Sequence, residues 1–446
     1  MASSRKLSSA NLTERIAARI APLLPAHSSI LIGLSGGVDS VVLLHLLSQL
    51  APRFSWRLSA LHVHHGISPN AGAWAEFCSR LCARHHISLH IEHVDIAPLR
   101  ALGIEAAARK LRHAAFAGQA CDFVALAHHA DDQAETLLLQ LLRGAGVRGA
   151  SAMPLLAERA RSPGVLRPLL HCSRREILAY AEAHGLQWIE DESNADDSYP
   201  RNFLRHRLLP LLEEKFPAYR NTLTRSSQHF AEANVLLDEL AQQDSALAIH
   251  AETLAVAALQ DLSQPRAKNL LRYFLHTCGA PMPQAVQLDN MLQQLCNARE
   301  DAAVCIAYGN WQVRRYQGGV YAIPALVEFD RNLILPWRDE AELDWPALNK
   351  RLHFIRSQGI GISLAKLQRA PVTLRLRCGG ESLRPYQNAA VRTLKNLLQE
   401  SRVPPWQRDR MPLLYCGEEL VSVPGVAIAA EYQAAANEAG MQLLDE

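Results

Sequence analysis

Residues 35–40, which read SGGVDS, form the first pattern in this sequence that could carry chemistry. They lie between an apolar run at 29–34 and a second apolar run at 40–50, a strand–loop–helix arrangement. Small residues there let main-chain N–H groups close on an anion, and the start of a helix adds partial positive charge. We therefore predict a phosphate-binding loop that consists of Ser35, Gly36, Gly37, Val38, Asp39 and Ser40. A glycine-rich turn with a capping serine is the alternative.

The carboxylate in this loop indicates a metal. Asp39 alone would repel a phosphate group, so its position predicts a bridging Mg²⁺ held by oxygen ligands. Asp39 is thus the candidate metal ligand.

Two further polar patterns follow along the chain. Residues 62–66 (HVHHG) close the next apolar run and are typical of a strand end near solvent. They could also bind a metal, but no Cys or carboxylate stands at ligand spacing. Arg109 and Arg112 share a helix face with Glu105. They form either an ion-paired solvated face or, at a cleft, a clamp for phosphate.

Residues 127–136 (AHHADDQAET) are the densest polar group. Three carboxylates and two imidazoles lie within eight residues, where a buried strand gives way to an apolar helix. Such a group fits Mg²⁺ binding or proton transfer.

Apolar periodicity predicts the elements that must position these residues. Strands are expected at 29–34, 58–65, 88–95 and 122–129, and helices at 40–50, 73–86 and 104–120. This alternation predicts an α/β fold with a doubly wound parallel sheet, whose ligand lies at the carboxyl ends of the strands. Each polar pattern falls at such an end.

Later segments predict further domains. We expect a catalytic domain over 1–215 and a mostly helical middle domain over 216–330 that ends in strands. A linker with two prolines follows at 331–350, and a small α+β domain with a helix at 388–400 fills 351–446.

Composition excludes several classes of protein. The chain has 446 residues, with 46 Lys and Arg against 44 Asp and Glu, so its charge of +2 gives no global case for a polyanion partner. Nine scattered cysteines without a C-x-x-C argue against disulfides, zinc and iron–sulfur clusters. No signal peptide or apolar stretch of about 18 residues is present, so we expect a cytoplasmic protein with no membrane span.

Nucleic-acid contact would then depend on local clusters of basic residues. The run of Arg201, Arg205, His206 and Arg207 is most often a solvated helix face. A second cluster, interleaved with Tyr386 and Trp406, suits phosphate contacts with base stacking. This cluster consists of Arg375, Arg377, Arg384, Arg392, Lys395, Arg402, Arg408 and Arg410.

The motifs together resemble a known family. SGGVDS resembles the loop of the N-type ATP pyrophosphatases, and a Walker A pattern is absent. With the 62–67, 104–116 and 127–153 segments and WIEDESNADDSYPRNFLRHRLLP at 188–210, it resembles the tRNA(Ile)-lysidine synthetases over roughly 28–215. RLRCGGESLRP (375–385) and the 394–415 segment resemble the terminal domain of that family's long form.

The resemblance implies a reaction. In that family the wobble cytidine of a CAU anticodon is adenylated at its 2-oxo group, and lysine displaces AMP to give lysidine. It implies ATP and Mg²⁺ as cofactors, and L-lysine and tRNA(Ile) with a CAU anticodon as partners bound in part by the middle and C-terminal domains. The tRNA would thereby be recoded from methionine to isoleucine.

The resemblance also assigns residues. Ser35, Gly36, Gly37, Asp39 and Ser40 match the ATP-binding loop. The residues with catalytic counterparts in the family are Asp39, Asp132, Arg109 and Arg205, and we add His62, His128 and Arg112 to the nucleotide-binding set. His113 and Ser68 depart from the family, which often has Tyr and Arg there.

Two rival functions remain open. A tRNA 2-thiolation enzyme of the same superfamily would need reactive cysteines, and Cys78 and Cys82 share a helix face that reads as core. A non-catalytic tRNA-binding protein is disfavoured by the intact set of Asp39, Arg109 and Asp132. The oligomeric state is open, with a homodimer as one option.

Overall fold

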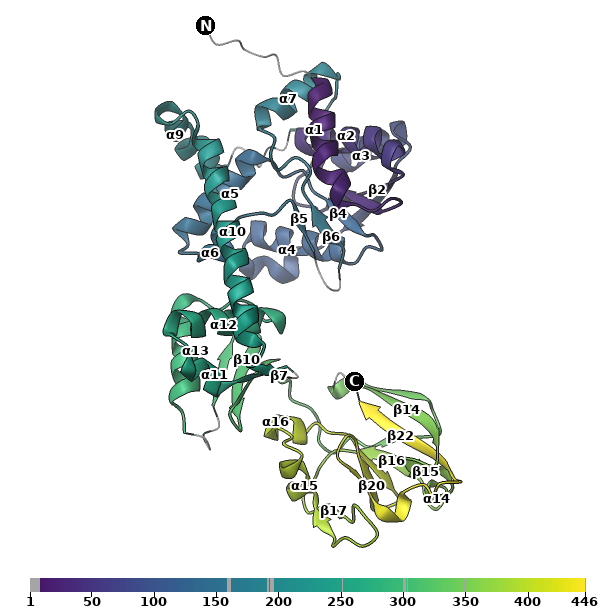
Figure 1. Cartoon of the computed structure of the whole chain (residues 1–446). Coiled ribbons are helices and arrows are strands. Elements are labelled where there is room, and N and C mark those ends of the chain that lie inside the picture. Colours follow the sequence, from purple (N-terminus) through teal and green to yellow (C-terminus); the bar gives the residue numbers. More distant parts are fainter. Residues whose placement is uncertain are drawn as a thin grey trace. The chain divides into compact units, whose positions relative to one another are not determined.

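A computed structural model describes residues 9–158, 162–190, 192, 196–250, 252–299, 302, 304–348 and 350–445 (Figure 1). The chain divides into two compact units, Met1–Leu237 and Asp238–Glu446. None of the described helices is both long and apolar enough to cross a membrane.

The first unit is built on a six-stranded sheet with the order β3-β2-β1-β4-β6-β5. Its strands are β1 (Ser29–Gly33), β2 (Arg57–His64), β3 (Ser88–His93), β4 (Phe123–Ala125), β5 (Leu156–Ala157) and β6 (Gly164–Leu166). All pairs are parallel except β5 with β6. The predicted doubly wound parallel sheet is confirmed.

Helices connect these strands and complete the core. They are α1 (Ser9–Ile20), α2 (Val38–Phe54), α3 (Ala71–Arg84), α4 (Ile104–Ala117), α5 (Ala130–Leu142), α6 (Val147–Ala150) and α7 (Arg174–Ala183). Short turns η1 (Ala21–Leu23) and η2 (Ala97–Leu102) lie between them. α2 contacts β1, α1 and α7, so its run Val41–Leu44 is buried throughout and shows little amphipathic pattern. The strand expected at 122–129 ends at Ala125, since α5 begins at Ala130.

The unit closes with α8 (Pro200–Phe203), the π-helical turn η4 (Leu204–Leu208) and α9 (Leu209–Lys215). Helix α10 (Tyr219–Ser245) follows and contains the division between the two units.

The second unit begins with helices packed on an antiparallel sheet of order β7-β8-β11-β10-β9. Its helices are α11 (Val256–Asp261), α12 (Gln264–Thr277) and α13 (Ala285–Asn297). Its strands are β7 (Ile249–His250), β8 (Thr253–Ala255), β9 (Cys305–Tyr308), β10 (Trp311–Tyr316) and β11 (Gly319–Pro324). Leu270, Met291 and Val313 lie in the core of this α+β segment, which is separate from the core of the first unit.

The C-terminal segment forms two further sheets and a two-stranded ribbon. Their orders are β12-β16-β19-β20-β21, β13-β14-β22-β15 and β17-β18. The strands are β12 (Leu335–Pro336), β13 (Glu342–Trp345), β14 (Lys350–Gln358), β15 (Ile362–Ser363), β16 (Val372–Arg375), β17 (Ser382–Leu383), β18 (Arg392–Thr393), β19 (Leu413–Cys416), β20 (Glu419–Val423), β21 (Ala427–Ile428) and β22 (Ala439–Asp445). The remaining elements are η5 (Pro346–Leu348), α14 (Leu364–Leu367), α15 (Leu394–Glu400), α16 (Pro405–Arg408) and η6 (Ala430–Tyr432).

The stretch expected as a linker, 331–350, differs from that expectation. It supplies β12 and β13, which pair with β16 and β14, and Trp345 is fully buried. Pro336 is tolerated because β12 is an edge strand, and Pro346 follows the end of β13. The helix expected at 388–400 begins at Leu394, where the Thr393 side chain accepts a hydrogen bond from the Asn396 N–H.

Candidate active site

The SGGVDS loop joins β1 to the start of α2, as its pattern predicted. The Gly36 N–H donates to Ser40 Oγ (3.1 Å), and that hydroxyl donates to the Gly37 carbonyl (2.9 Å). Gly36 has φ +90°, and a Cβ there would lie 2.7 Å from Ile189 Cδ1. The loop is thus folded tightly on itself, with its amides at the N-terminus of a 17-residue helix.

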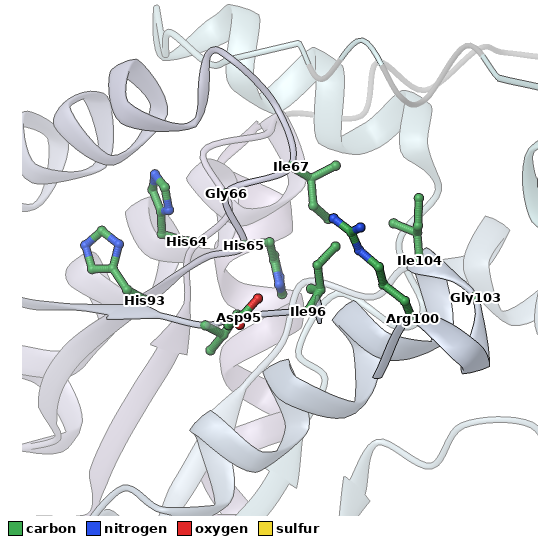
Figure 2. Close-up of a pocket in the computed structure, with 11 residues that line it drawn as sticks. His64, His65, Gly66, Ile67, His93, Asp95, Ile96, Arg100, Gly103 and Ile104 are labelled. Carbon is green, nitrogen blue, oxygen red and sulfur yellow. The ribbon is translucent and has the colours of Figure 1, made fainter. Parts of the chain in front are cut away.

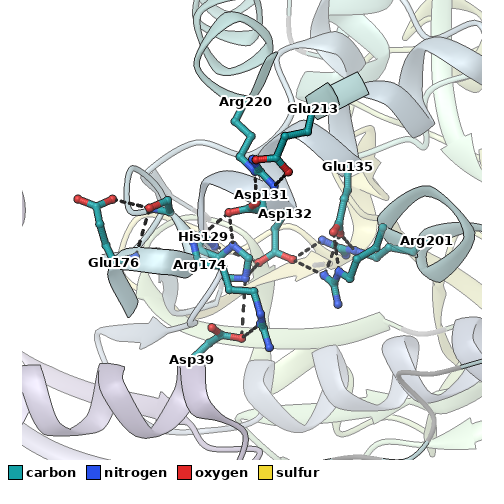
Figure 3. A network of polar contacts seen from close by, with 12 residues as sticks. Asp39, His129, Asp131, Asp132, Glu135, Arg174, Glu176, Arg201, Glu213 and Arg220 are labelled. Atoms are coloured by element: carbon teal, nitrogen blue, oxygen red, sulfur yellow. Dashed lines mark hydrogen bonds and ion pairs between the residues drawn. The ribbon is translucent and has the colours of Figure 1, made fainter. Parts of the chain in front are cut away.

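Asp39 lies in the first turn of α2 and faces the network of polar contacts in Figure 3. Its Oδ2 accepts a hydrogen bond from Arg174 Nη1 (3.0 Å) and lies 3.8 Å from His129 Nε2. Its Oδ1 is buried and has no hydrogen-bond partner among the described residues. A buried carboxylate oxygen without a donor is costly and marks a place for a cation.

His129 connects Asp39 to the start of α5. Its ring is 1% exposed, and besides Asp39 it lies 3.6 Å from Asp131 Oδ2 and 3.5 Å from Asp132 Oδ2. The main-chain N–H of His129 donates to Asp132 Oδ2 (3.0 Å), which fixes this carboxylate at the N-terminus of α5. Three carboxylates therefore surround one buried imidazole.

Two arginines neutralise the carboxylates of α5. Arg201 donates to Asp132 Oδ1 (2.9 Å) and Glu135 Oε2 (2.7 Å). Arg205 donates to Glu135 Oε1 (2.7 Å) and Oε2 (3.0 Å) and reaches Asp132 Oδ1 at 3.3 Å. Burial would raise the pKa of Asp132, but His129 and Arg201 outweigh it, so the pKa is below its ordinary value. Asp132 is therefore an ionised carboxylate at neutral pH.

The arginines of α4 act on histidines at the strand ends. The pKa of His128 is lowered to about 3, chiefly by burial, and Arg109 is one of the charges that contribute to this lowering. Burial likewise lowers the pKa of His65 to about 4, with Arg112 as the next cause. Both arginine side chains are exposed. α4 therefore places two cations beside neutral imidazoles at the edge of the site.

The His62 ring lies inside the fold. It is 5% exposed, its Nδ1 is 2.9 Å from the Leu34 carbonyl oxygen, and the Cys78 thiol lies at 3.6 Å. Its imidazole thus joins β1, β2 and α3.

The structure brings some of the predicted residues together and leaves others at the edge. Asp39, Asp132 and Arg205 belong to one network, whereas Arg109 and Arg112 border it. The sequence did not mark Arg174 and Arg201 as site residues, whereas His129 and Glu135 belonged to the polar group at 127–136 without an individual role. Arg201 and Arg205 are four residues apart, and Asp132 and Glu135 of α5 are three apart, so each pair lies on one helix face. This matched spacing was a signal that the two pairs could meet, whereas no local pattern marked Arg174.

Asp39 fits a magnesium ion, because its buried Oδ1 accepts no hydrogen bond from the described residues and could bind a cation. No group of three or more His, Cys, Asp or Glu side chains in the described ranges is arranged to hold a metal. Mg²⁺ is commonly held by one or two carboxylates together with substrate phosphates. Asp39 would therefore supply the protein ligand and a bound nucleotide the rest.

Most of the basic cluster expected to contact nucleic acid is paired within the protein. Arg375, Arg377, Arg384 and Arg392 face Glu418, Glu381, Glu431 and Glu400. Arg408 and Arg410 bind the carbonyls of Val403 and Val327. Trp406 packs against Tyr316 and Tyr321, while Tyr386 is 71% exposed. Exposed Lys395 and Arg402 remain without an ion pair to any described residue.

All nine cysteines are free. Burial raises the pKa of Cys78 to about 12 and that of Cys82 to about 11, so both thiols are protonated and inert at neutral pH. This helix face is core, as the sequence indicated.

Comparison with known proteins identifies each part of the chain. Family profiles match at residues 9–212 (PP-loop domain), 254–321 (TilS substrate binding domain) and 372–444 (TilS substrate C-terminal domain). The tRNA(Ile)-lysidine synthase of Nitrosomonas europaea is 41% identical over 443 residues, 99% of this chain and 97% of its own. That of Aromatoleum aromaticum is 41% identical over 430 residues (96% and 99%), and that of Coxiella burnetii 38% over 420 (94% and 93%). The chain therefore belongs to the tRNA(Ile)-lysidine synthase family, as its motifs indicated.

Proposed function

We propose that this protein joins lysine to the wobble cytidine of a CAU-anticodon tRNA(Ile) and converts ATP to AMP and pyrophosphate. The observation that carries the proposal is the meeting of Asp39 of the phosphate loop with the α5 carboxylates around His129. The phosphate loop and the carboxylates of α5 thus lie together at the carboxyl ends of the parallel strands, where such folds bind their ligands.

In the first step the cytidine 2-oxo group attacks the α-phosphorus of ATP, and the bond to pyrophosphate breaks. The amides of residues 36–40 at the start of α2 would hold the phosphates, and Arg109 and Arg112 would balance their charge. Asp39 would hold Mg²⁺, which neutralises charge on the departing pyrophosphate.

In the second step an amine of lysine attacks C2 of the activated cytidine, and AMP leaves with the former 2-oxo oxygen. Asp132 would attract and orient the lysine ammonium, because its lowered pKa keeps it ionised. The ammonium would give a proton to solvent before its amine attacks, since an ionised Asp132 is a poor proton acceptor. Arg205 and Arg201 are positioning residues here, since they fix the carboxylates of Asp132 and Glu135.

We further propose that the chemistry belongs to residues 1–215 and that 216–330 and 351–446 bind the tRNA body, in the cytoplasm. Nine free cysteines support a reducing compartment. Every site residue named above comes from one chain, so the scheme needs no second subunit. A homodimer would contain two such sites. Sulfur transfer is not favoured, because Cys78 and Cys82 are buried and protonated.

The test is direct. The protein is incubated with ATP, Mg²⁺, radiolabelled lysine and an unmodified CAU-anticodon tRNA, and the nucleosides are then analysed. We expect labelled lysidine with one AMP and one pyrophosphate per lysine, and no label when tRNA is omitted. Absence of label in the nucleoside, with pyrophosphate still released, would contradict the ligation step.

A further inference from the structure

A cavity of about 840 Å³ lies outside the network of Figure 3, at the carboxyl ends of β2 and β3. Its wall includes His64 at the end of β2, His65 after it, His93 at the end of β3, Arg100 of η2, and Ile67 and Ile104 (Figure 2). This is ample space for one nucleotide, since ligand sites commonly measure about 300–1,000 Å³.

Two polar groups of this cavity, on Arg100 and His65, have no hydrogen-bond partner among the described residues. The Arg100 side chain is exposed and makes no hydrogen bond or ion pair with the residues that the structure describes. His65 Nδ1 is buried and has no hydrogen-bond partner there. Asp95 Oδ1 accepts a hydrogen bond from the Ala97 N–H (2.8 Å), which holds this carboxylate at the start of η2 and leaves its second oxygen available. The Arg100 guanidinium therefore offers an anionic group a partner, and the His65 ring offers a hydrogen bond beside it.

The same cavity has apolar and aromatic surfaces. Ile67 is 48% and Ile104 46% exposed, and Figure 2 shows the Arg100 side chain running toward Ile67. The rings of His64 and His93 lie 4.6 Å apart between centroids. Exposed isoleucines and paired imidazoles beside a free guanidinium are the surfaces on which an unstacked base can rest.

We propose that this cavity binds the tRNA nucleotide next to the wobble cytidine, with its phosphate on Arg100 and its base against Ile67, Ile104 and the imidazoles. The inference rests on the proposed function and adds a subsite to it. Neighbouring strands are about 4.8 Å apart, so in the order β3-β2-β1 the cavity lies within about 5–10 Å of the strand that carries the phosphate loop. That is the range of one step along an extended nucleic-acid strand.

Two other occupants are outcomes of the test. Lysine could place its carboxylate on Arg100 and its ammonium on Asp95, and a rise in KM for lysine with unchanged KM for RNA would overturn the proposal. The adenosine of ATP shares the nucleotide chemistry, and the experiment separates it from the tRNA.

The experiment compares Arg100→Ala and Ile67→Ala with Arg84→Ala, using an anticodon stem-loop RNA in the lysine-incorporation assay. Arg84 is an exposed arginine at the end of α3, before β3 begins, and so lies away from the carboxyl ends. We expect KM for RNA to rise about tenfold in both cavity variants and to stay within twofold in the control. KM for ATP should stay within twofold in all three, and equal melting temperatures would show that the variants fold.

A second arm tests the base itself. Stem-loops with an abasic site at either neighbour of the cytidine should raise KM for the wild type at one position, and Ile67→Ala should add nothing further there. A rise in KM for ATP with unchanged KM for RNA would assign the cavity to adenosine and overturn the proposal, as would unchanged values for both substrates. Failure of the proposed function is distinct, because the wild type would then incorporate no lysine.

Discussion

Glu135 is fully buried and faces two guanidinium groups, and this makes it the most constrained charge of the site. We expect Glu135→Gln to lower the free energy of unfolding by about 2–3 kcal/mol, because Arg201 and Arg205 would lose half their compensation in a desolvated place. Urea denaturation of the chain measures this loss.

The matched control is Glu213→Gln. Glu213 also binds an arginine, Arg220, but its side chain is 50% exposed. Such a pair contributes about 0–1 kcal/mol. Equal losses in the two variants would show that burial does not decide the strength of these pairs.

The half-buried His128 makes stability depend on pH. Burial lowers its pKa to about 3 in the folded chain, against 6.5 for an ordinary histidine. Below pH 6.5 the unfolded chain therefore takes up a proton that the folded chain does not, so stability falls as the pH falls from 6.5 toward 3. We expect His128→Gln to remove up to about 1.4 kcal/mol per pH unit of that decline.

Urea midpoints measured from pH 7 to pH 4.5 test this expectation. His229→Gln is the control, because the His229 side chain is 69% exposed on α10 and its removal should leave the slope as in the wild type. A slope for His128→Gln that matches the wild type would mean that another group governs the acid response.

At the scale of elements, local pattern predicted the sheet and its helices because the central apolar runs, β1 and α2, are buried along most of their length. β1 at 29–33 and α2 at 38–54 lie within a few residues of their expected bounds. The end of β4 was missed because residues 126–129 are still apolar or aromatic although they already lead into α5. Arg201 looked like a solvated face because its partners lie 66 and 69 residues earlier in the chain. Such a contact leaves no local sequence signal.

The phosphate loop allows a prediction at the same scale. Gly36 has φ +90° and no room for a Cβ beside Ile189, whereas Gly37 has φ −70° and its nearest Cβ contact would be 3.6 Å. We expect Gly36→Ala to cost about 1–2 kcal/mol of stability and Gly37→Ala less than about 0.5 kcal/mol. KM for ATP should rise in both, because either methyl group crowds the amides. Thermal melts and ATP titrations read the two effects separately, and equal stability losses would contradict the strain argument.

At the scale of the whole molecule, the chain has separate hydrophobic cores. The core around Ile32 and Leu46, the one around Leu270 and the one around Leu374 share no residue. The net charge is only +2, so a basic surface for nucleic acid can come only from local clusters of Arg and Lys. Within the C-terminal segment, ion pairs such as Arg375–Glu418 and Arg392–Glu400 leave only a few basic side chains of the cluster for phosphate contacts.

The last prediction follows from that reduction. If the C-terminal domain holds the tRNA backbone, exposed Lys395 and Arg402 should do so, whereas Arg392, paired with Glu400, should not. Each phosphate contact contributes a slope of roughly −0.7 to −0.9 to log affinity against log salt. The Lys395→Ala/Arg402→Ala variant should therefore flatten that slope by roughly 1.5, and Arg392→Ala should leave it nearly unchanged. Filter binding of tRNA(Ile) at several salt concentrations measures both slopes. If Arg392→Ala flattens the slope as much as the double variant, the ion pair opens on binding and the whole basic cluster takes part.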